Sequence, residues 1–275
     1  MESNHTTKFS QYEASFDEVK KLISIIEEVA DGKYSNDIME FTKPGHSKTI
    51  QRIAEAVGMM MVRVEAREMR LEQLIEELRE LNALLKKNII QTVITIANAL
   101  GARDQYTEGH AQRVAIYSER LARKVELAED EVETIKIGGM LHDIGKIGFS
   151  DRMFTSEDVK FSKDMIKEIR HHPKIGANIL KDIEFLGPVL EYVRHHHESV
   201  DGTGYPDGIR DEEIPMGAKI ISVADCFDAI TTERSYQKGR DKEEASVILR
   251  SLSGKGLSAE LVEAFIEEIK ENGML

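Results

Sequence analysis

Apolar residues recur along most of the chain every three to four positions, which is the spacing of one face of an α-helix. Few segments alternate with the period of two that half-buried strands require. The helical pattern covers residues 16–29 and, without any Gly or Pro, residues 59–100. Gly32, Pro44 and Gly45 interrupt it between these two stretches. We therefore expect an all-α protein in which a long helical region precedes a bundle of further helices.

The second stretch carries a heptad repeat, in which apolar residues occupy two positions of every seven. These positions hold Val64, Leu71, Leu74, Leu78, Leu81 and Leu85, with Arg67 as the break. Glu and Lys residues surround the leucines, which is typical of solvated coiled coils and favours a parallel homodimer. The alternative is a helix that packs on the rest of its own chain.

The N-terminal region also has a recognisable order of elements. Residues 1–12 are polar and are expected to form a frayed, disordered tail. The helix, connector and second helix over residues 13–85 weakly resemble a HAMP signal-relay module. This resemblance implies a signalling and dimerisation region that responds to an upstream sensor or signalling partner.

Composition and charge limit the classes of function. The chain has 275 residues, 41% of them hydrophobic, and a formal net charge of −13. Nucleic-acid polymers are bound largely by Lys and Arg that neutralise phosphates, so this charge argues against DNA or long RNA as a partner. A small phosphate ester can still bind where metal ions reverse the local potential.

The expected location is the cytoplasm. A single cysteine, Cys226, excludes an intramolecular disulfide and suits a reducing compartment. The first residues lack the charged segment and apolar core of a signal peptide. The most apolar run, at 57–62, is too short to span a bilayer, so we expect no transmembrane segment.

Histidines are concentrated in the second half of the chain, where seven of the nine lie between His110 and His197. His110 shares an apolar helical face, which alone is typical of a hydrogen-bonded core histidine. His142 is followed by Asp143, and Lys146 comes one turn later. An adjacent His and Asp supply a neutral nitrogen and a carboxylate that can bridge two cations.

Three more histidines lie beside prolines and glycines. Pro173 is expected to start a new helix, which would leave His172 at a helix junction facing a cleft and His171 exposed. His196 and His197 come at the end of a helix begun by Pro188, and His195 falls on another face. The loop DGTGYPDG follows, with glycines that could bring backbone amides near a ligand.

Asp225 completes the candidate cluster. It shares one side of an apolar helix with Ile221 and Asp228, where a buried carboxylate needs a cap, an ion pair or a metal. The candidate metal ligands are five imidazoles and two carboxylates: His110, His142, Asp143, His172, His196, His197 and Asp225. They are too many for one ion, so we expect two divalent metals bridged by Asp143. Mixed nitrogen and oxygen ligands favour iron or manganese, with zinc, nickel and cobalt left open.

These motifs resemble a known family. His110, HDIGK at 142–146 and Asp225 resemble the HD superfamily of metal-dependent phosphohydrolases. HHP at 171–173, HHE at 196–198 and DGTGYPDG at 201–208 resemble its HD-GYP subfamily. The resemblance covers residues 88–273, which implies a catalytic HD-GYP domain there and the signalling region at 13–87.

The resemblance implies hydrolysis of cyclic di-GMP to pGpG, and in some members on to GMP, by a water activated by two metals. It implies that the seven candidate residues are metal ligands and that Asp143 and Lys146 are catalytic, with Lys146 contacting the scissile phosphate. The implied substrate-side residues are Lys146, Asp201, Gly204, Tyr205, Pro206, Arg234 and Lys238.

Departures from the family pattern and rival functions bear on this expectation. Tyr106 stands where some relatives have a glutamate that helps hold a third metal, which favours a binuclear site. Lys219 and the segment RSYQK replace an arginine and RPYR, which affects how guanine would be recognised. The rivals are a catalytically inactive cyclic di-GMP sensor or scaffold, and an HD phosphohydrolase that acts on another nucleotide.

Overall fold

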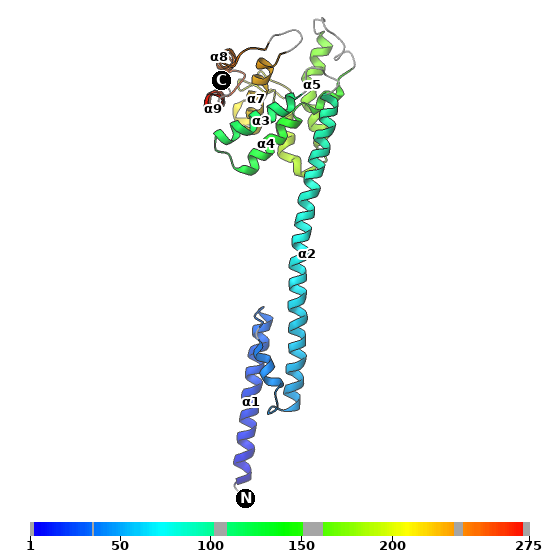
Figure 1. The fold of residues 1–275 in the computed structure, drawn as a ribbon, viewed down its shortest axis with the longest axis vertical. Coiled ribbons are helices and arrows are strands. Elements are labelled where there is room, and N and C mark those ends of the chain that lie inside the picture. Colours follow the sequence, from blue (N-terminus) through cyan, green and yellow to red (C-terminus); the bar gives the residue numbers. More distant parts are fainter. Residues whose placement is uncertain (1–2, 35, 102–108, 151–161, 234–238, 272–275) are drawn as a thin grey trace. The chain divides into compact units, whose positions relative to one another are not determined.

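A computed structural model describes residues 3–34, 36–101, 109–150, 162–233 and 239–271. Within these ranges every regular element is a helix and none is a strand, which confirms the all-α prediction (Figure 1). The chain forms two compact units, residues 1–84 and 85–275. Among the described helices, none has the length and apolar content needed to cross a bilayer.

The first unit consists of α1 (Ser3–Ala30), the 3₁₀ helix η1 (Asn36–Thr42) and the start of α2 (Lys48–Gly101). Its core joins one face of α1 to one face of α2, with η1 packed beside them: Leu22, Ile25, Val29, Ile38, Phe41, Ile50, Ala54 and Met61. The helix α1 begins at Ser3, so it includes residues 3–12, which were expected to belong to a frayed tail. The proposed division into tail, signalling region and catalytic domain stays a prediction.

The helix α2 is uninterrupted for 54 residues and contains the whole of the helical stretch expected at 59–100. The leucines of its heptad repeat are exposed, from 43% at Leu74 to 65% at Leu78. The last turns of α2 differ, because Ile90, Val93 and Ile94 pack on a cluster of the second unit. One helix therefore has a solvated apolar stripe followed by a segment fixed in a domain core.

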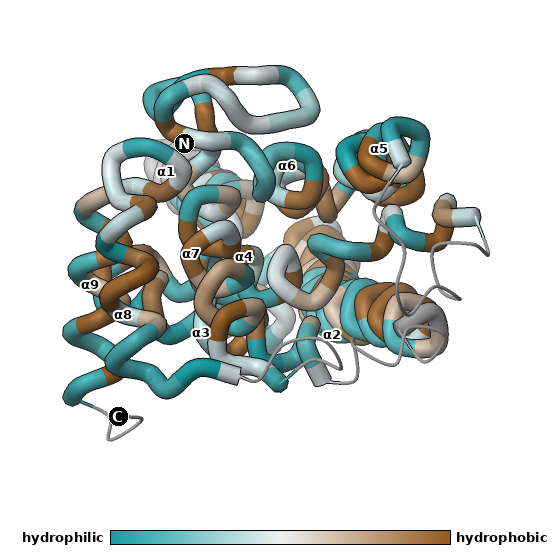
Figure 2. The backbone as a smooth tube through the Cα atoms, turned by 90° about the horizontal axis from the view of Figure 1, so that it is seen from above, coloured by the Kyte–Doolittle hydropathy of each residue, from teal (hydrophilic) through white to brown (hydrophobic). Residues whose placement is uncertain are grey.

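The second unit is a helical bundle with α7 at its centre. After α2 it contains α3 (His110–Lys124), α4 (Glu129–Leu141), η2 (Ile144–Gly148), α5 (Lys163–Leu180), η4 (Glu184–Leu186), α6 (Gly187–His195), η5 (Asp211–Glu213), α7 (Met216–Thr231), α8 (Lys242–Leu252) and α9 (Ala259–Glu271). The helix α7 packs against α3, α4, α6, α8 and α9. Its sequence is apolar on most sides, as expected of a helix surrounded by others, whereas α8 and α9 mix apolar and polar residues (Figure 2).

Glycines let two pairs of backbones approach closely. A Cβ on Gly139 of α4 would lie 2.8 Å from the Cα of Ala115 in α3. A Cβ on Gly145 of η2 would lie 1.9 Å from the carbonyl oxygen of His172 and 2.6 Å from the backbone nitrogen of Gly176, both in α5. The HDIGK segment can therefore lie against the backbone of α5 only because residue 145 has no side chain.

We expect Gly145→Ala to lower the free energy of unfolding of the second unit by about 1–3 kcal/mol, because the added methyl group must push η2 away from α5. Thermal denaturation followed by circular dichroism measures this loss. Gly256→Ala is the matched control, since a Cβ there meets no atom within 4 Å. Equal stability of the two variants would show that the contact with α5 is not tight.

Candidate metal centre

The structure brings the seven candidate ligands together from five parts of the second unit. His110 begins α3, His142 and Asp143 follow α4, and His172 lies inside α5. His196 and His197 follow α6, and Asp225 lies in α7. Six of the seven fall into two groups. Ligand atoms lie within 4.8 Å of one another among His110, His142 and Asp143, the first group, and likewise among His172, His196 and His197, the second group.

Asp143 lies between the two groups. Its Oδ2 atom is 3.3 Å from the Nε2 atom of His142 and 3.7 Å from that of His110. Its Oδ1 atom is 3.4 Å from the Nε2 atom of His172. One carboxylate oxygen thus faces each group, which is the arrangement that a bridging ligand requires.

Asp225 approaches the first group from α7. Its Oδ1 atom lies 3.4 Å from the Nε2 atom of His110 and 3.9 Å from that of His142. Burial works to raise the pKa of Asp225, but the hydrogen bond from His110 and the nearby imidazoles hold it well below the usual range. Burial also opposes ionisation of Asp143, and Lys146 with His142 holds the pKa of that carboxyl low. Both carboxylates are therefore charged inside the cluster.

The histidines of the second group are kept neutral. Burial lowers the pKa of His172 to about 4 and lowers the pKa of His196 well below its usual value. The pKa of His197 is also lowered, again mainly by burial. Neutral imidazoles are the form that binds metal ions.

His110 behaves differently from these three histidines. Burial alone would lower its pKa, but hydrogen bonds with Asp225 and Asp228 outweigh this effect and raise the pKa to about 9. A proton on its Nε2 atom then lies among the carboxylates of Asp225 and Asp143. A metal ion bound there would replace that proton, so metal binding at this position releases a proton.

Three of the histidines share one orientation. Each Nδ1 atom contacts the main-chain carbonyl three residues earlier: His142 with Gly139 at 2.8 Å, His172 with Ile169 at 2.6 Å and His196 with Val193 at 2.8 Å. A carbonyl oxygen only accepts hydrogen bonds, so each Nδ1 carries the proton. In the neutral ring, Nε2 is then a bare lone pair directed into the cluster.

The surroundings of these lone pairs show whether the residues fit a cation. The Nε2 atom of His142 is buried, makes no hydrogen bond and faces the carboxylate of Asp143 at 3.3 Å. The Nε2 atoms of His172 and His196 face each other at 3.4 Å. Buried acceptors that face only other acceptors are costly, and a divalent ion between them removes that cost. The donor set therefore fits metal ions.

One local prediction is wrong. Pro173 was expected to end one helix and start another, but α5 runs unbroken from Lys163 to Leu180 with the proline inside it. A proline lacks the N–H that would bond the carbonyl four residues earlier, which here belongs to Ile169. The Nδ1 atom of His172 donates to that carbonyl instead, at 2.6 Å. The proline thus frees an acceptor that orients the neighbouring histidine.

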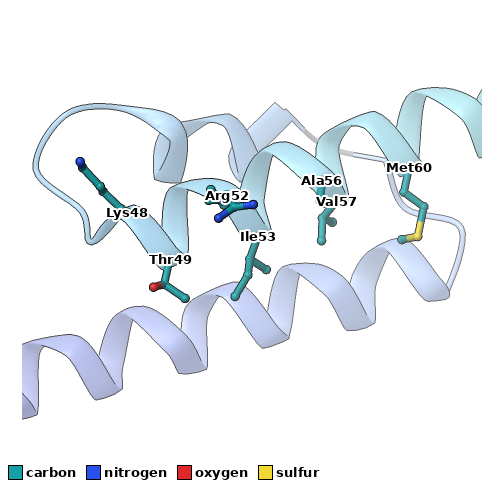
Figure 3. Close-up of a pocket in the computed structure, with 7 residues that line it drawn as sticks. All are labelled: Lys48, Thr49, Arg52, Ile53, Ala56, Val57 and Met60. Atoms are coloured by element: carbon teal, nitrogen blue, oxygen red, sulfur yellow. The ribbon is translucent and has the colours of Figure 1, made fainter.

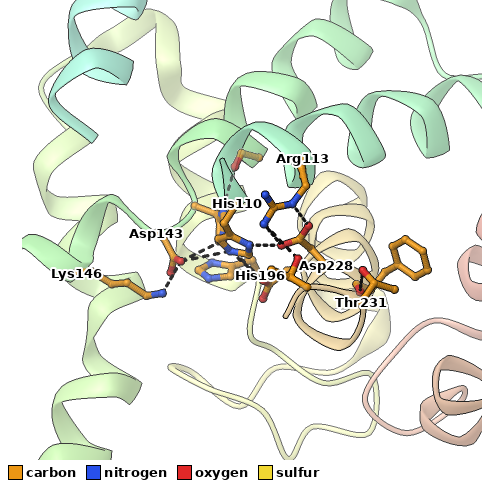
Figure 4. A network of polar contacts seen from close by, with 12 residues as sticks. His110, Arg113, Asp143, Lys146, His196, Asp228 and Thr231 are labelled. Atoms are coloured by element: carbon orange, nitrogen blue, oxygen red, sulfur yellow. Dashed lines mark hydrogen bonds and ion pairs between the residues drawn. The ribbon is translucent and has the colours of Figure 1, made fainter. Parts of the chain in front are cut away.

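Asp228 contacts the candidate centre in a way that the sequence did not reveal. It is 1% exposed, and its Oδ2 atom accepts a hydrogen bond from the Nδ1 atom of His110 at 2.7 Å. The Arg113 guanidinium donates to the same carboxylate, with 3.0 Å between Nη2 and Oδ2. Figure 4 shows this chain of contacts from Arg113 through Asp228 and His110 to Asp143. The available signal was spacing, because Asp228 lies one turn after Asp225 and Arg113 one turn after His110.

Lys146 lies at the edge of the cluster. Its Nζ atom is 2.6 Å from the Oδ2 atom of Asp143, and its side chain is 31% exposed. A cation in this position can reach a negatively charged ligand that approaches from solvent.

The loop of residues 201–208, which we call the GYP loop, lies beside His197. The rings of Tyr205 and His197 are 4.9 Å apart and tilted by 33°. A Cβ on Gly204 would lie 2.2 Å from the nitrogen of Ser199, so only glycine fits there. Asp201 closes a turn inside the loop by accepting hydrogen bonds from the N–H and hydroxyl of Thr203. Arg234, Lys238 and Tyr106 lie outside the described residues.

Comparison with known proteins places this centre in a family. A family model described as the HD domain matches residues 95–259, more than half of the chain. A cyclic di-GMP phosphodiesterase of Thermotoga maritima is 39% identical over 184 residues, which cover 65% of this chain and 49% of that protein. A 3'3'-cGAMP-specific phosphodiesterase of Vibrio cholerae is 33% identical over 189 residues, covering 68% of this chain and 36% of that protein.

A solved structure agrees at the level of the fold. The crystal structure of a cyclic GMP-AMP specific phosphodiesterase from Vibrio cholerae has a TM-score of 0.52 and 22% identity, covering 67% of this chain and 49% of that one. The chain spans about half or less of the length of the curated relatives named above.

The helical bundle and its His/Asp clusters, which could hold metal ions, are those of an HD domain. The chain belongs to the HD-domain family. Within it, the HHP, HHE and GYP motifs and the similarity to cyclic di-GMP phosphodiesterases place the chain in the HD-GYP subfamily.

We expect Asp228→Asn to weaken binding of Mn²⁺ about 10- to 100-fold, because the amide no longer fixes the ring of His110 through a charged acceptor. Calorimetric titration of the metal-free protein measures this change, with circular dichroism to check the fold. Glu263→Gln is the matched control, since Glu263 is also paired with an arginine, Arg250, but on the surface between α8 and α9. Equal metal affinity of both variants would exclude a role for Asp228 in the centre.

Proposed function

We propose that this protein is a metal-dependent phosphodiesterase that hydrolyses cyclic di-GMP to pGpG and uses two divalent ions, iron or manganese. The observation that carries the proposal is the position of Asp143, with one carboxylate oxygen facing each of two histidine groups. The named activities of the relatives from Thermotoga maritima and Vibrio cholerae support a cyclic dinucleotide as the substrate.

Each part of the site has a role in this proposal. The seven candidate ligands hold the ions: His110, His142, Asp143, His172, His196, His197 and Asp225. Divalent ions held there would supply a bound water of lowered pKa and positive charge for the phosphate. Lys146 adds a cation at the exposed edge of the same cluster, where it can contact the scissile phosphate. In this proposal the GYP loop, with Tyr205 beside His197, forms one wall of the substrate site.

Two rivals are separated by one assay. Relatives named for 3'3'-cGAMP support a second substrate candidate, the mixed guanine and adenine cyclic dinucleotide. A catalytically inactive sensor would bind cyclic di-GMP without turnover. Anaerobic assays with Fe²⁺ or Mn²⁺, both dinucleotides in competition and chromatography of the products decide among these. We expect pGpG to form faster than the linear product of cGAMP, and tight binding without any product would support the sensor instead.

We expect Asp143→Ala to reduce hydrolysis by more than about 100-fold, because loss of an inner ligand must exceed the 10- to 100-fold effect of outer-sphere residues. Its helical content should be unchanged, and its bound metal should fall. The control is His171→Ala, the exposed neighbour of His172 on α5. Wild-type turnover in Asp143→Ala would contradict the proposed centre.

We also propose that the chain forms a parallel homodimer through the heptad stripe of α2. The first unit has a groove of about 630 Å³. Its lining includes Ile53, Val57 and Met60 of α2, which point toward α1 in Figure 3. Ile53 and Met60 are separated by seven residues, and Val57 and Val64 likewise, so the groove continues the heptad register upstream. A second copy would cover the exposed leucines 71–85 and this groove with one continuous seam.

We expect Leu74→Glu with Leu78→Glu to halve the mass measured by light scattering, because four buried carboxylates would face one another across the seam. Gln73→Glu with Ala83→Glu adds the same charge at exposed positions outside the stripe and should leave the mass unchanged. A wild-type protein that is already monomeric would favour the alternative, in which α2 packs on its own chain.

A further inference from the structure

The ring of Tyr205 contacts both His197, a candidate metal ligand, and Arg170 of α5. Its ring lies against that of His197, with 4.9 Å between the centroids. On α5, the Arg170 guanidinium lies 5.7 Å from the centroid of the Tyr205 ring. The position of this one ring therefore determines the shape of the wall next to His197.

Glu198 holds the GYP loop from inside the domain. Glu198 is only 3% exposed. Its Oε1 atom accepts hydrogen bonds from the backbone nitrogens of Asp207 at 2.6 Å and Gly208 at 3.1 Å. The nitrogen of Tyr205 donates to the carbonyl of His197 at 3.1 Å. A buried carboxylate bonded to backbone amides ties the end of the loop to the segment that carries His196 and His197.

Asp207 holds the same end of the loop from outside. Its carboxylate accepts two hydrogen bonds from Arg194 of α6, at 2.7 and 3.1 Å. The Nζ atom of Lys174 in α5 lies 3.2 Å away, and the Nε2 atom of His195 lies 3.4 Å away. The hydrogen bonds from Arg194 lower the pKa of Asp207 to about 2, so the carboxyl is charged at neutral pH. One side chain thus connects the GYP loop with α5 and α6.

Neither carboxylate belongs to the candidate metal cluster, yet both act on the residues that directly follow Tyr205 and Pro206. The geometry points to Glu198 and Asp207 as positioning residues that clamp the GYP loop and hold Tyr205 against His197, so that the wall is formed before substrate arrives. This inference rests on the proposed function in assigning that wall to the substrate. The clamp itself is a property of the free protein and can be measured without turnover.

The first test is kinetic. We expect Asp207→Asn to raise KM for cyclic di-GMP about three- to tenfold, since a paired but partly exposed carboxylate is lost, with kcat within about twofold and metal content unchanged. Asp207→Glu should restore most of the loss. A general loss of stability would instead lower kcat and bound metal together.

The second test is hydrogen exchange on the metal-loaded, full-length protein without substrate. We expect faster exchange of the amides of Tyr205 and Gly208 in Asp207→Asn, and a larger effect in Glu198→Gln, which directly alters an acceptor of the Gly208 amide. The matched control is Glu263→Gln, because Glu263 pairs with Arg250 at 2.8 Å between α8 and α9, outside the loop and the metal cluster. That variant should leave both amides and KM unchanged.

The outcomes separate the two proposals. Unchanged exchange in Asp207→Asn overturns the clamp, whether or not the enzyme is active. Faster exchange with an unchanged KM also overturns the inference, because the loop would then not form the substrate wall. If the wild-type protein gave no turnover, the proposed function would fail while the exchange experiment still decided the clamp.

Discussion

The centre depends on hydrogen bonds made by the histidine Nδ1 atoms, which are not the atoms that face the cluster. His142, His172 and His196 each donate their Nδ1 proton to a main-chain carbonyl three residues earlier, and His110 donates to Asp228. These bonds fix the rings and direct the four Nε2 atoms at one another and at two carboxylates. Without a cation such a cluster is electrostatically costly, since acceptors face acceptors in a buried space. The proton held by His110 at a raised pKa relieves that cost only in part. The arrangement therefore favours the binding of positive charge among the Nε2 atoms and the two carboxylates.

The fold provides the carbonyl acceptors of these hydrogen bonds and brings the helices that carry them together. The carbonyls belong to helices, so each ring is oriented by the element that carries it, and the helices must then be brought close. Gly139 allows α4 to approach α3, and Gly145 allows the HDIGK segment to lie on α5. The buried helix α7 positions Asp225 toward the ligands and Asp228 toward His110. Pro173 contributes by removing a backbone donor, which leaves the carbonyl of Ile169 to His172. Residues that bind nothing thus determine the geometry of those that do.

The sequence was sufficient for features with a period or a motif. The helical spacing predicted the all-α fold and the long helix α2, and motif resemblance identified the residues that the structure brings together. Features that depend on partners distant in sequence were not accessible. Asp228 was seen to share a face with Asp225, but its bond to His110 joins residues 118 positions apart. Glu198 and Asp207 looked like ordinary motif residues until the amides and the arginine they contact were known. The prediction at Pro173 was wrong because a proline inside a helix leaves one carbonyl without its backbone donor, and here His172 donates to that carbonyl, of Ile169, so α5 continues.

Electron paramagnetic resonance of the metal-free protein, titrated with Mn²⁺ under anaerobic conditions, tests directly whether Asp143 joins two metal sites. A carboxylate with one oxygen toward each group should hold two ions close enough to couple magnetically. We expect two bound ions per chain and a multiline spectrum from a coupled pair, which Asp143→Ala abolishes. A single uncoupled ion at saturation, or two ions whose signals are independent and unaffected by that substitution, would contradict it.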